Sequence, residues 1–154
     1  PFADGAFTGA ACRFSFHHFV NPARVFAEMT RVISPRGWMV IADMTASEEE
    51  AKAALHNELE RLADPTHSRT LAVSEFERIF AANGFRTVMK IARDARPPID
   101  DWLGFNDTTP ENAARIRELM EASVDGDRAG LRAIRDGATI RTMRTSTVFV
   151  LERE

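Results

Sequence analysis

The sequence predicts an α/β fold in which a mostly parallel sheet is flanked by helices. Two short runs, residues 9–14 and 38–43, are small or apolar at nearly every position, as expected of strands that are buried on both faces of a parallel sheet. A helical pattern lies between them, so the three segments predict a βαβ unit with a right-handed crossover. A third apolar run, residues 145–151, predicts another buried strand.

The helix of this βαβ unit has clear boundaries. Residues 1–5 are expected to form a turn ahead of the first strand. Asn21 suits the N-cap of the helix and Pro22 its first turn, while Pro35 and Gly37 are expected to end it. The apolar residues at helical spacing between these ends are Val25, Phe26, Met29, Val32 and Ile33.

Two more helices and a strand are expected next. Ser47 is the predicted N-cap of the first helix, which is expected to end before Pro65. Residues 65–71 predict a loop, and either Thr70 or Ser74 is predicted to cap the second helix. The strand at residues 85–92 is expected to place four side chains on one face, Phe85, Thr87, Met89 and Ile91.

The pattern is less regular after this strand. Residues 99–105 predict a short helix with Trp102 and Phe105 at core spacing, and Pro110 opens a longer helix. Residues 126–137 are expected to form a mainly helical connection. The apolar strand at residues 145–151 is expected to be central in the sheet rather than at its edge.

Composition and charge narrow the functional classes. A formal net charge of −3 offers no basic surface for nucleic acid, and no apolar stretch reaches membrane-spanning length, so no membrane partner is expected. The only cysteine, Cys12, excludes an internal disulfide and fits a reducing, cytoplasmic compartment; its neighbours favour packing over a nucleophilic role. His17 and His18 lack acidic or cysteine ligands at metal spacing, so no metal is expected.

The order and spacing of several short motifs are also informative. They are Pro1 to Phe7, Cys12-Arg13, His17-His18-Phe19, Pro22-Ala23, Pro35-Arg36-Gly37, Asp64 to His67 and Gly84-Phe85. Together these motifs resemble the second half of the class I S-adenosylmethionine (SAM) dependent methyltransferases, in the branch that includes the ubiquinone/menaquinone-type enzymes. The resemblance covers roughly the first 90 residues well and the rest loosely. It implies that the last strand inserts antiparallel between its neighbours, so that the expected order of strands across the sheet is 9–14, 38–43, 145–151 and 85–92.

The departures from this family are equally specific. The Gly-rich turn that follows the first strand of the Rossmann-like methyltransferase sheet is absent, as is the acidic residue that ends its second strand. Thr8, Phe16 and Arg36 stand where the family often has an acidic residue, a leucine and a glycine. The resemblance therefore implies that residues 1–154 are one domain, the C-terminal portion of a methyltransferase domain without its Gly-rich N-terminal half.

The resemblance implies SAM as the cofactor and methyl transfer to a small-molecule acceptor as the reaction. It places Phe2, Arg13, Phe14 and His18 at the cofactor, because ligands in open α/β sheets bind at the carboxyl ends of strands where strand order reverses. No catalytic residue is assigned, since holding an activated methyl donor in line with its acceptor supplies much of the catalysis.

Substrate contacts are expected from Asp43 at the end of the second strand, and from His67 and Arg69 in the following loop. Each candidate has a structural alternative. Asp43 is equally suited to capping a helix or turn. For the loop residues the alternative is a structural turn network, and for Arg13 it is a solvated charge at a strand end. His17 is weighed equally between packing and a place near the following helix.

Two other functions remain open at this stage. Without the preceding strands, residues 9–14 would form an apolar edge, and an inactive fragment would dimerise through it. Alternatively, the cleft would hold a different apolar ligand in a binding module. Binding of SAM separates the enzyme from both alternatives.

Overall fold

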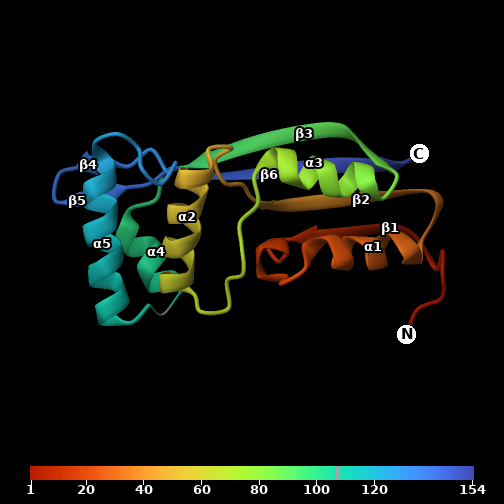
Figure 1. Cartoon of the computed structure of the whole chain (residues 1–154), viewed down its shortest axis with the longest axis horizontal. Coiled ribbons are helices and arrows are strands. Elements are labelled where there is room, and N and C mark those ends of the chain that lie inside the picture. Colours follow the sequence, from red (N-terminus) through yellow and green to blue (C-terminus); the bar gives the residue numbers. More distant parts are fainter. Residues whose placement is uncertain (107) are drawn as a thin grey trace.

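The computed structural model, which describes residues 1–106 and 108–154, combines helices with a four-stranded mixed sheet of order β1-β2-β6-β3 (Figure 1). The elements follow in the order β1 (Phe7–Arg13), the one-turn 3₁₀ helix η1 (Phe16–His18), α1 (Pro22–Val32), β2 (Ile33–Met44), α2 (Glu50–Ala63), α3 (Val73–Ala82), β3 (Phe85–Ala95), α4 (Ile99–Phe105), α5 (Pro110–Val124), β4 (Ile134–Asp136), β5 (Thr139–Arg141) and β6 (Arg144–Arg153).

The predicted strand order is confirmed. β1 runs parallel to β2, with Arg13 opposite Ala42, and β6 runs antiparallel to both β2 and β3. The apolar character of β6 agrees with its central place, since Phe149 and Leu151 are fully buried. The α/β class expected from the sequence is therefore the observed one.

One face of the sheet is covered by α1 and α3, which lie along it (Figure 1). The core beneath them is dominated by phenylalanine rings that pack edge-on or tilted against one another. This sheet core contains Phe16, Phe26, Ile33, Met39, Ile41, Leu71, Phe76, Phe80, Phe85, Phe149 and Leu151. It fixes β1 and β2 against α1, and thereby positions the turn that follows β1.

The other face of the sheet carries large apolar side chains that solvent reaches, including Trp38 (50% exposed), Met89 (53%) and Ile91 (43%). The prediction that Met89 and Ile91 share a face with Phe85 is wrong. A bulge shifts the β3–β6 register, so that Thr87 pairs with Leu151 but Met89 pairs with Val150. The extra residue reverses the alternation, which periodicity alone does not reveal.

Gly9 meets Trp38 on this open face. The two residues are partners in the β1–β2 register, and a Cβ placed on Gly9 would lie 2.4 Å from the Trp38 ring. Glycine is therefore required at this position as long as Trp38 keeps its place.

The helices α2, α4 and α5 gather with the β4–β5 hairpin at one end of the sheet (Figure 1). Their core is mostly aliphatic and includes Leu59, Ile99, Trp102, Leu103, Ile116, Met120 and Leu131. The helical connection predicted over residues 126–137 is wrong. Glycines 126, 130 and 137 have φ values of 91°, 66° and 62°, so the chain turns repeatedly and then enters the hairpin.

The helix caps agree in part with the sequence. Asn21 caps α1 as predicted, accepting the Arg24 N–H at 3.0 Å, although α1 ends at Val32, before the predicted stop. Ser47 is wrong as the cap of α2, which begins at Glu50. At α3, the cap is neither predicted residue, because Ala72 holds that position and its N–H donates to Glu75 at 3.0 Å. Among the described helices, none is long and apolar enough to cross a membrane.

Candidate active site

The chain turns sharply where β1 ends. Phe14 follows Arg13 with a φ of 47°, in the left-handed region that favours glycine. Its N–H donates to the carbonyl of Ala42 at 2.8 Å, and η1 begins two residues later. This turn carries the chain across the carboxyl end of β2, where Asp43 lies.

Asp43 holds this turn in place. Its carboxylate is fully buried and accepts hydrogen bonds from the backbone N–H groups of Phe16 (2.7 Å) and His17 (3.2 Å). It also accepts the N–H of Met44 at 2.7 Å and contacts Nδ1 of His17 at 2.6 Å. Four donors thus surround one buried carboxylate, so Asp43 positions η1 from behind.

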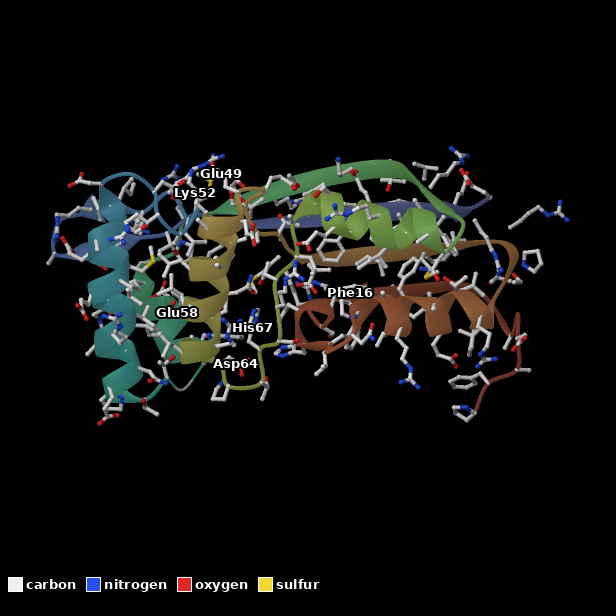
Figure 2. All side chains as sticks on the ribbon, in the orientation of Figure 1. Phe16, Glu49, Lys52, Glu58, Asp64 and His67 are labelled. Atoms are coloured by element: carbon white, nitrogen blue, oxygen red, sulfur yellow. The ribbon has the colours of Figure 1, made fainter. Side chains whose placement is uncertain are left out.

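Three histidines meet in front of Asp43. The ring of His17 lies 4.2 Å from that of His18 and stacks on His67 at 5.4 Å between centroids. The carbonyl of His17 accepts the N–H groups of Ser68 and Arg69, both at 2.9 Å. These bonds fasten the loop after α2 to η1, and Figure 2 marks His67 and Asp64 in that loop, between α2 and Phe16.

A cavity of about 470 Å³ opens onto these histidines. Its walls come from the turn after β1, from α2 and the loop behind it, from α4 and from the start of β6. The lining residues are Phe14, His17, His18, Met44, Glu60, Asp64, His67, Trp102, Phe105, Asn106 and Arg144. We call this the histidine cavity.

A buried ion pair forms one wall of the histidine cavity. Glu60 accepts a hydrogen bond from Arg144 and contacts Nε2 of His56 at 3.2 Å. Burial alone would raise the pKa of Glu60, but Arg144 and His56 lower it to about 2. The Arg144 guanidinium stacks over the Trp102 ring at 4.4 Å. Within the described part of the chain, Arg144 Nη1 and Trp102 Nε1 have no hydrogen-bond acceptor.

His67 is held in its neutral form. Asn57 donates its amide hydrogens to the carbonyls of Ala53 and Thr70, so its oxygen faces His67 and accepts from Nε2 at 3.0 Å. Burial lowers the pKa of His67 to about 4, with the neighbouring histidines adding to that shift. A neutral ring therefore stacks on His17 at physiological pH.

Three of the residues predicted to bind the cofactor, Arg13, Phe14 and His18, lie at this turn. Phe2 lies at the opposite end of β1 and α1, where its carbonyl accepts a hydrogen bond from Arg31. Phe14 and His18 line the histidine cavity, and the Arg13 guanidinium lies over the Phe14 ring at 4.7 Å. Phe2 packs edge-on against Phe7 at 4.9 Å. Phe2 and His18 both line a second, mostly apolar cavity of about 660 Å³ beside α1, with Phe19, Val25, Met29 and Val32 among its other walls.

The residues predicted to bind substrate are separated by the structure. His67 lines the histidine cavity, whereas Asp43 lies behind η1 with no exposed surface. Arg69 points elsewhere, pairing with Glu75 at the start of α3. His17, which the sequence left open between packing and a place near the following helix, faces the cavity. The register of the two parallel strands indicates this place for His17. Arg13 at the end of β1 is opposite Ala42, and Asp43 is the next residue of β2.

A metal centre is not indicated by this geometry. In residues 1–106 and 108–154, no group of three or more His, Cys, Asp or Glu side chains is arranged to hold a metal ion.

Comparison with known families settles the class of the protein. Residues 1–90 match the family model described as "Methyltransferase domain", which is more than half of the chain. The chain belongs to this methyltransferase family. The matched region of the methyltransferase domain contains the turn after β1, Asp43 and the three clustered histidines, whereas α4, α5 and β6 lie outside it.

Individual relatives agree with this assignment. The uncharacterized methyltransferase YcgJ of Bacillus subtilis is 35% identical over 83 residues, 54% of this chain and 33% of that protein. A solved structure of a candidate methyltransferase from Bacillus halodurans superposes with a TM-score of 0.91 at 22% identity, covering 99% of this chain and 66% of that one. Geranyl diphosphate C-methyltransferase from Streptomyces coelicolor, in complex with S-adenosyl-L-homocysteine, has a TM-score of 0.62 at 12% identity, covering all of this chain and 50% of that one.

These proteins share the α/β fold of this chain and are longer than it. The chain spans about a third of the length of the curated relatives that it matches.

Proposed function

We propose that this chain provides the acceptor side, and part of the cofactor site, of a SAM-dependent methyltransferase that acts on a small molecule. The observation that carries the proposal is the place of His18, which lines both the apolar cavity beside α1 and the histidine cavity. A methyl donor on one side of His18 and an acceptor on the other would meet at the turn after β1, where ligands of open α/β sheets bind.

The apolar cavity suits the cofactor. Phe2 and Phe19 offer aromatic surface to an adenine ring, and the Arg13 guanidinium is available for a carboxylate. The exposed Phe14 ring and the carboxylate of Asp64 favour a positively charged group at the histidine cavity. SAM supplies an activated methyl group on such a charged sulfur. The Streptomyces relative with S-adenosyl-L-homocysteine bound supports this choice of cofactor.

The acceptor would occupy the histidine cavity. His67 contacts it from the loop after α2, and Trp102 and Phe105 supply aromatic walls from α4. Asp43 contributes by fixing η1, and Arg69 by holding the loop through Glu75. The residues around the cavity exclude water and keep the acceptor in line with the donor.

The proposal also assigns the chain to the C-terminal portion of a longer methyltransferase domain, in the ubiquinone/menaquinone-type branch. The open face of the sheet with Trp38, Met89 and Ile91 supports the first part, because mostly parallel sheets are covered on both faces. The motif His17-His18-Phe19 supports the second part.

Titration calorimetry with SAM tests the cofactor assignment, after intact mass has fixed which chain is in the sample. Arg13→Ala is expected to weaken SAM binding about tenfold, because a charge-assisted hydrogen bond is lost. Arg86→Ala is the matched control: Arg86 is also exposed on a strand, but it pairs with Glu152 far from either cavity. Equal affinities of the two variants would contradict the assignment of Arg13, and absence of SAM binding by every chain that contains these residues would refute the function.

A homodimer is the second candidate, supported by the edge position of β1. Among the described strands, β1 pairs only with β2, so one side of its backbone is unpaired. If this edge joins two copies, light scattering gives twice the 17.2 kDa of one chain. Ala11→Lys on β1 would then restore the monomer, whereas Ala81→Lys on the exposed surface of α3 would not. A monomeric wild-type chain rules this candidate out.

A further inference from the structure

His17 and Asp43 form a buried pair whose arrangement goes beyond packing. Nδ1 of His17 lies 2.6 Å from Oδ1 of Asp43, and the two side chains are 10% and 0% exposed. The remaining acceptor capacity of Asp43 is taken by the N–H groups of Phe16, His17 and Met44. Because all of these partners are donors, Asp43 acts as an acceptor toward His17.

This arrangement selects one tautomer of His17. Because Asp43 accepts at Oδ1, Nδ1 of His17 must carry the hydrogen, which leaves a lone pair on Nε2. Nε2 forms no hydrogen bond with any of the described residues, and it is not among their fully buried unpartnered atoms. Since His17 lines the histidine cavity, this lone pair is open to the cavity.

The surroundings allow His17 to gain a proton. His67 stacks on it as a neutral ring, since burial lowers the pKa of His67 to about 4, and Asp43 lies directly behind it with a negative charge. The other charged or titratable groups that line the cavity are His18, Glu60, Asp64 and Arg144, and Arg144 is neutralised by Glu60. A cationic His17 would thus face one carboxylate directly, with no unpaired cation among these side chains.

We propose that Nε2 of His17 is the proton acceptor of the reaction and that the methyl acceptor is a hydroxyl group on an aromatic or otherwise apolar molecule. The inference rests on the proposed methyl transfer. The hydroxyl proton passes to Nε2, the oxygen lone pair forms the new C–O bond, and the donor C–S bond breaks with its electron pair remaining on sulfur. Asp43 is the positioning residue that fixes the tautomer and stabilises the resulting imidazolium.

The choice of a hydroxyl follows from the cavity. An alcohol or phenol oxygen is a weak nucleophile until it loses its proton, so a positioned base contributes to this reaction. Phe14, Met44, Trp102 and Phe105 give the cavity a largely aromatic and apolar wall that suits a ring-bearing molecule.

Nitrogen-15 NMR of the histidine rings tests the tautomer without cofactor or acceptor. His17 is expected to show a protonated Nδ1 and an unprotonated Nε2 at neutral pH, and Asp43→Asn is expected to abolish this preference. The sequence has four histidines, so the other three serve as internal controls. A protonated Nε2 in the neutral ring of wild-type His17 would overturn the proposal, whatever the outcome of the SAM titration.

Binding of 4-nitrophenol tests proton transfer directly. At a pH where the free probe is almost fully protonated, wild-type protein is expected to raise the yellow phenolate absorbance, with 4-nitroanisole as the probe that has no proton to give. His17→Gln should remove at least about nine-tenths of the increase, and Asp43→Asn should reduce it. An unchanged increase in His17→Gln, or 4-nitrophenol bound without any increase, overturns the role of His17. If the probe does not bind, the NMR tautomer decides.

Discussion

Two regions of the molecule bury their side chains in different ways: the sheet core beneath α1 and α3, and the helical end made by α2, α4 and α5. The sheet core is filled with phenylalanine rings, and the one buried carboxylate that borders it, Asp43, is surrounded by backbone donors. The helical end has an aliphatic core and buries Glu60 and His56 beside it, balanced by Arg144 from β6.

The candidate site lies where these two regions meet. Each region alone is a packed core, but the histidine cavity takes His17 from the sheet side and His67, Glu60 and Trp102 from the helical end. The family match covers the sheet side through residue 90, while α4 and α5 lie beyond it. The proposed proton acceptor, His17, thus comes from the matched region. Much of the cavity wall around the methyl acceptor comes from the region outside it.

Phe149→Ala should have the largest effect, because it removes a fully buried ring that packs on Phe76 and Phe80 at the centre of the sheet core. We expect a loss of about 3–5 kcal/mol in the free energy of unfolding. Urea denaturation followed through Trp38 on the sheet and Trp102 in the helical end shows whether the regions unfold together. If the Trp102 transition does not move, the two cores unfold independently.

Arg144→Leu is expected to cost about 3 kcal/mol, because it leaves the Glu60 carboxylate buried without its ionic partner. The double variant Glu60→Leu/Arg144→Leu should recover part of that loss, since no unpaired charge then remains. Chemical denaturation of the two single variants and the double variant completes the cycle. A double variant less stable than Arg144→Leu would mean that the pair contributes packing rather than charge balance.

Acidification should weaken the helical end through His67. Its pKa is about 4 when folded and about 6.5 when unfolded, so the unfolded chain binds the proton first and stability falls as pH drops from about 6.5 to about 4. We expect a loss of about 1 kcal/mol between about pH 7 and about pH 5, reduced from the full shift because the ring borders the cavity.

Glu60 acts in a lower pH window. Because the pKa of Glu60 is lowered to about 2, its ionised carboxylate stabilises the fold at pH values above the ordinary pKa of a glutamate. That contribution is lost as pH falls toward about 2. Denaturation curves of wild type and His67→Gln at about pH 7 and about pH 5 isolate the contribution of His67. The same loss in the variant would assign the effect to another group.

Substitutions at two helix caps should have the smallest effects on stability. One cap lies in each region, at α1 and at α5. Asn21 caps α1 with a 3.0 Å bond and Thr109 caps α5 with a 3.3 Å bond. Alanine at either position should lower stability by about 1 kcal/mol, with the smaller loss at Thr109 because its bond is longer. Thermal unfolding measures both, and a larger loss at Thr109 would reverse the expected ranking.

The sequence was most informative where buried strands and punctuating prolines occur. The central place of β6 and the start of α1 follow from local pattern, whereas the strand order follows from the family resemblance. The bulge after Thr87 and the hairpin within residues 126–141 do not, because a one-residue slip and glycine-rich turns leave little periodic signal.

For the candidate site, the structure shows where the expected residues lie. Phe14, His18 and His67 do line one cavity, since strand ends and the loop after α2 were placed correctly. Arg69 and Asp43 point elsewhere because short-range partners, Glu75 and the backbone of η1, hold them. The role of His17 needs the parallel register of β1 and β2, which only the structure supplies.

The central place of β6 has a consequence for synthesis. In the described sheet, β3 pairs only with β6, and β6 also pairs with β2. Both β2 and β3 therefore lack this partner until β6, which is translated after them, is available. Until residues 144–153 leave the ribosome, β2 and β3 each present an unpaired apolar edge. The nascent chain therefore stays prone to aggregation from the synthesis of β2 until β6 has emerged.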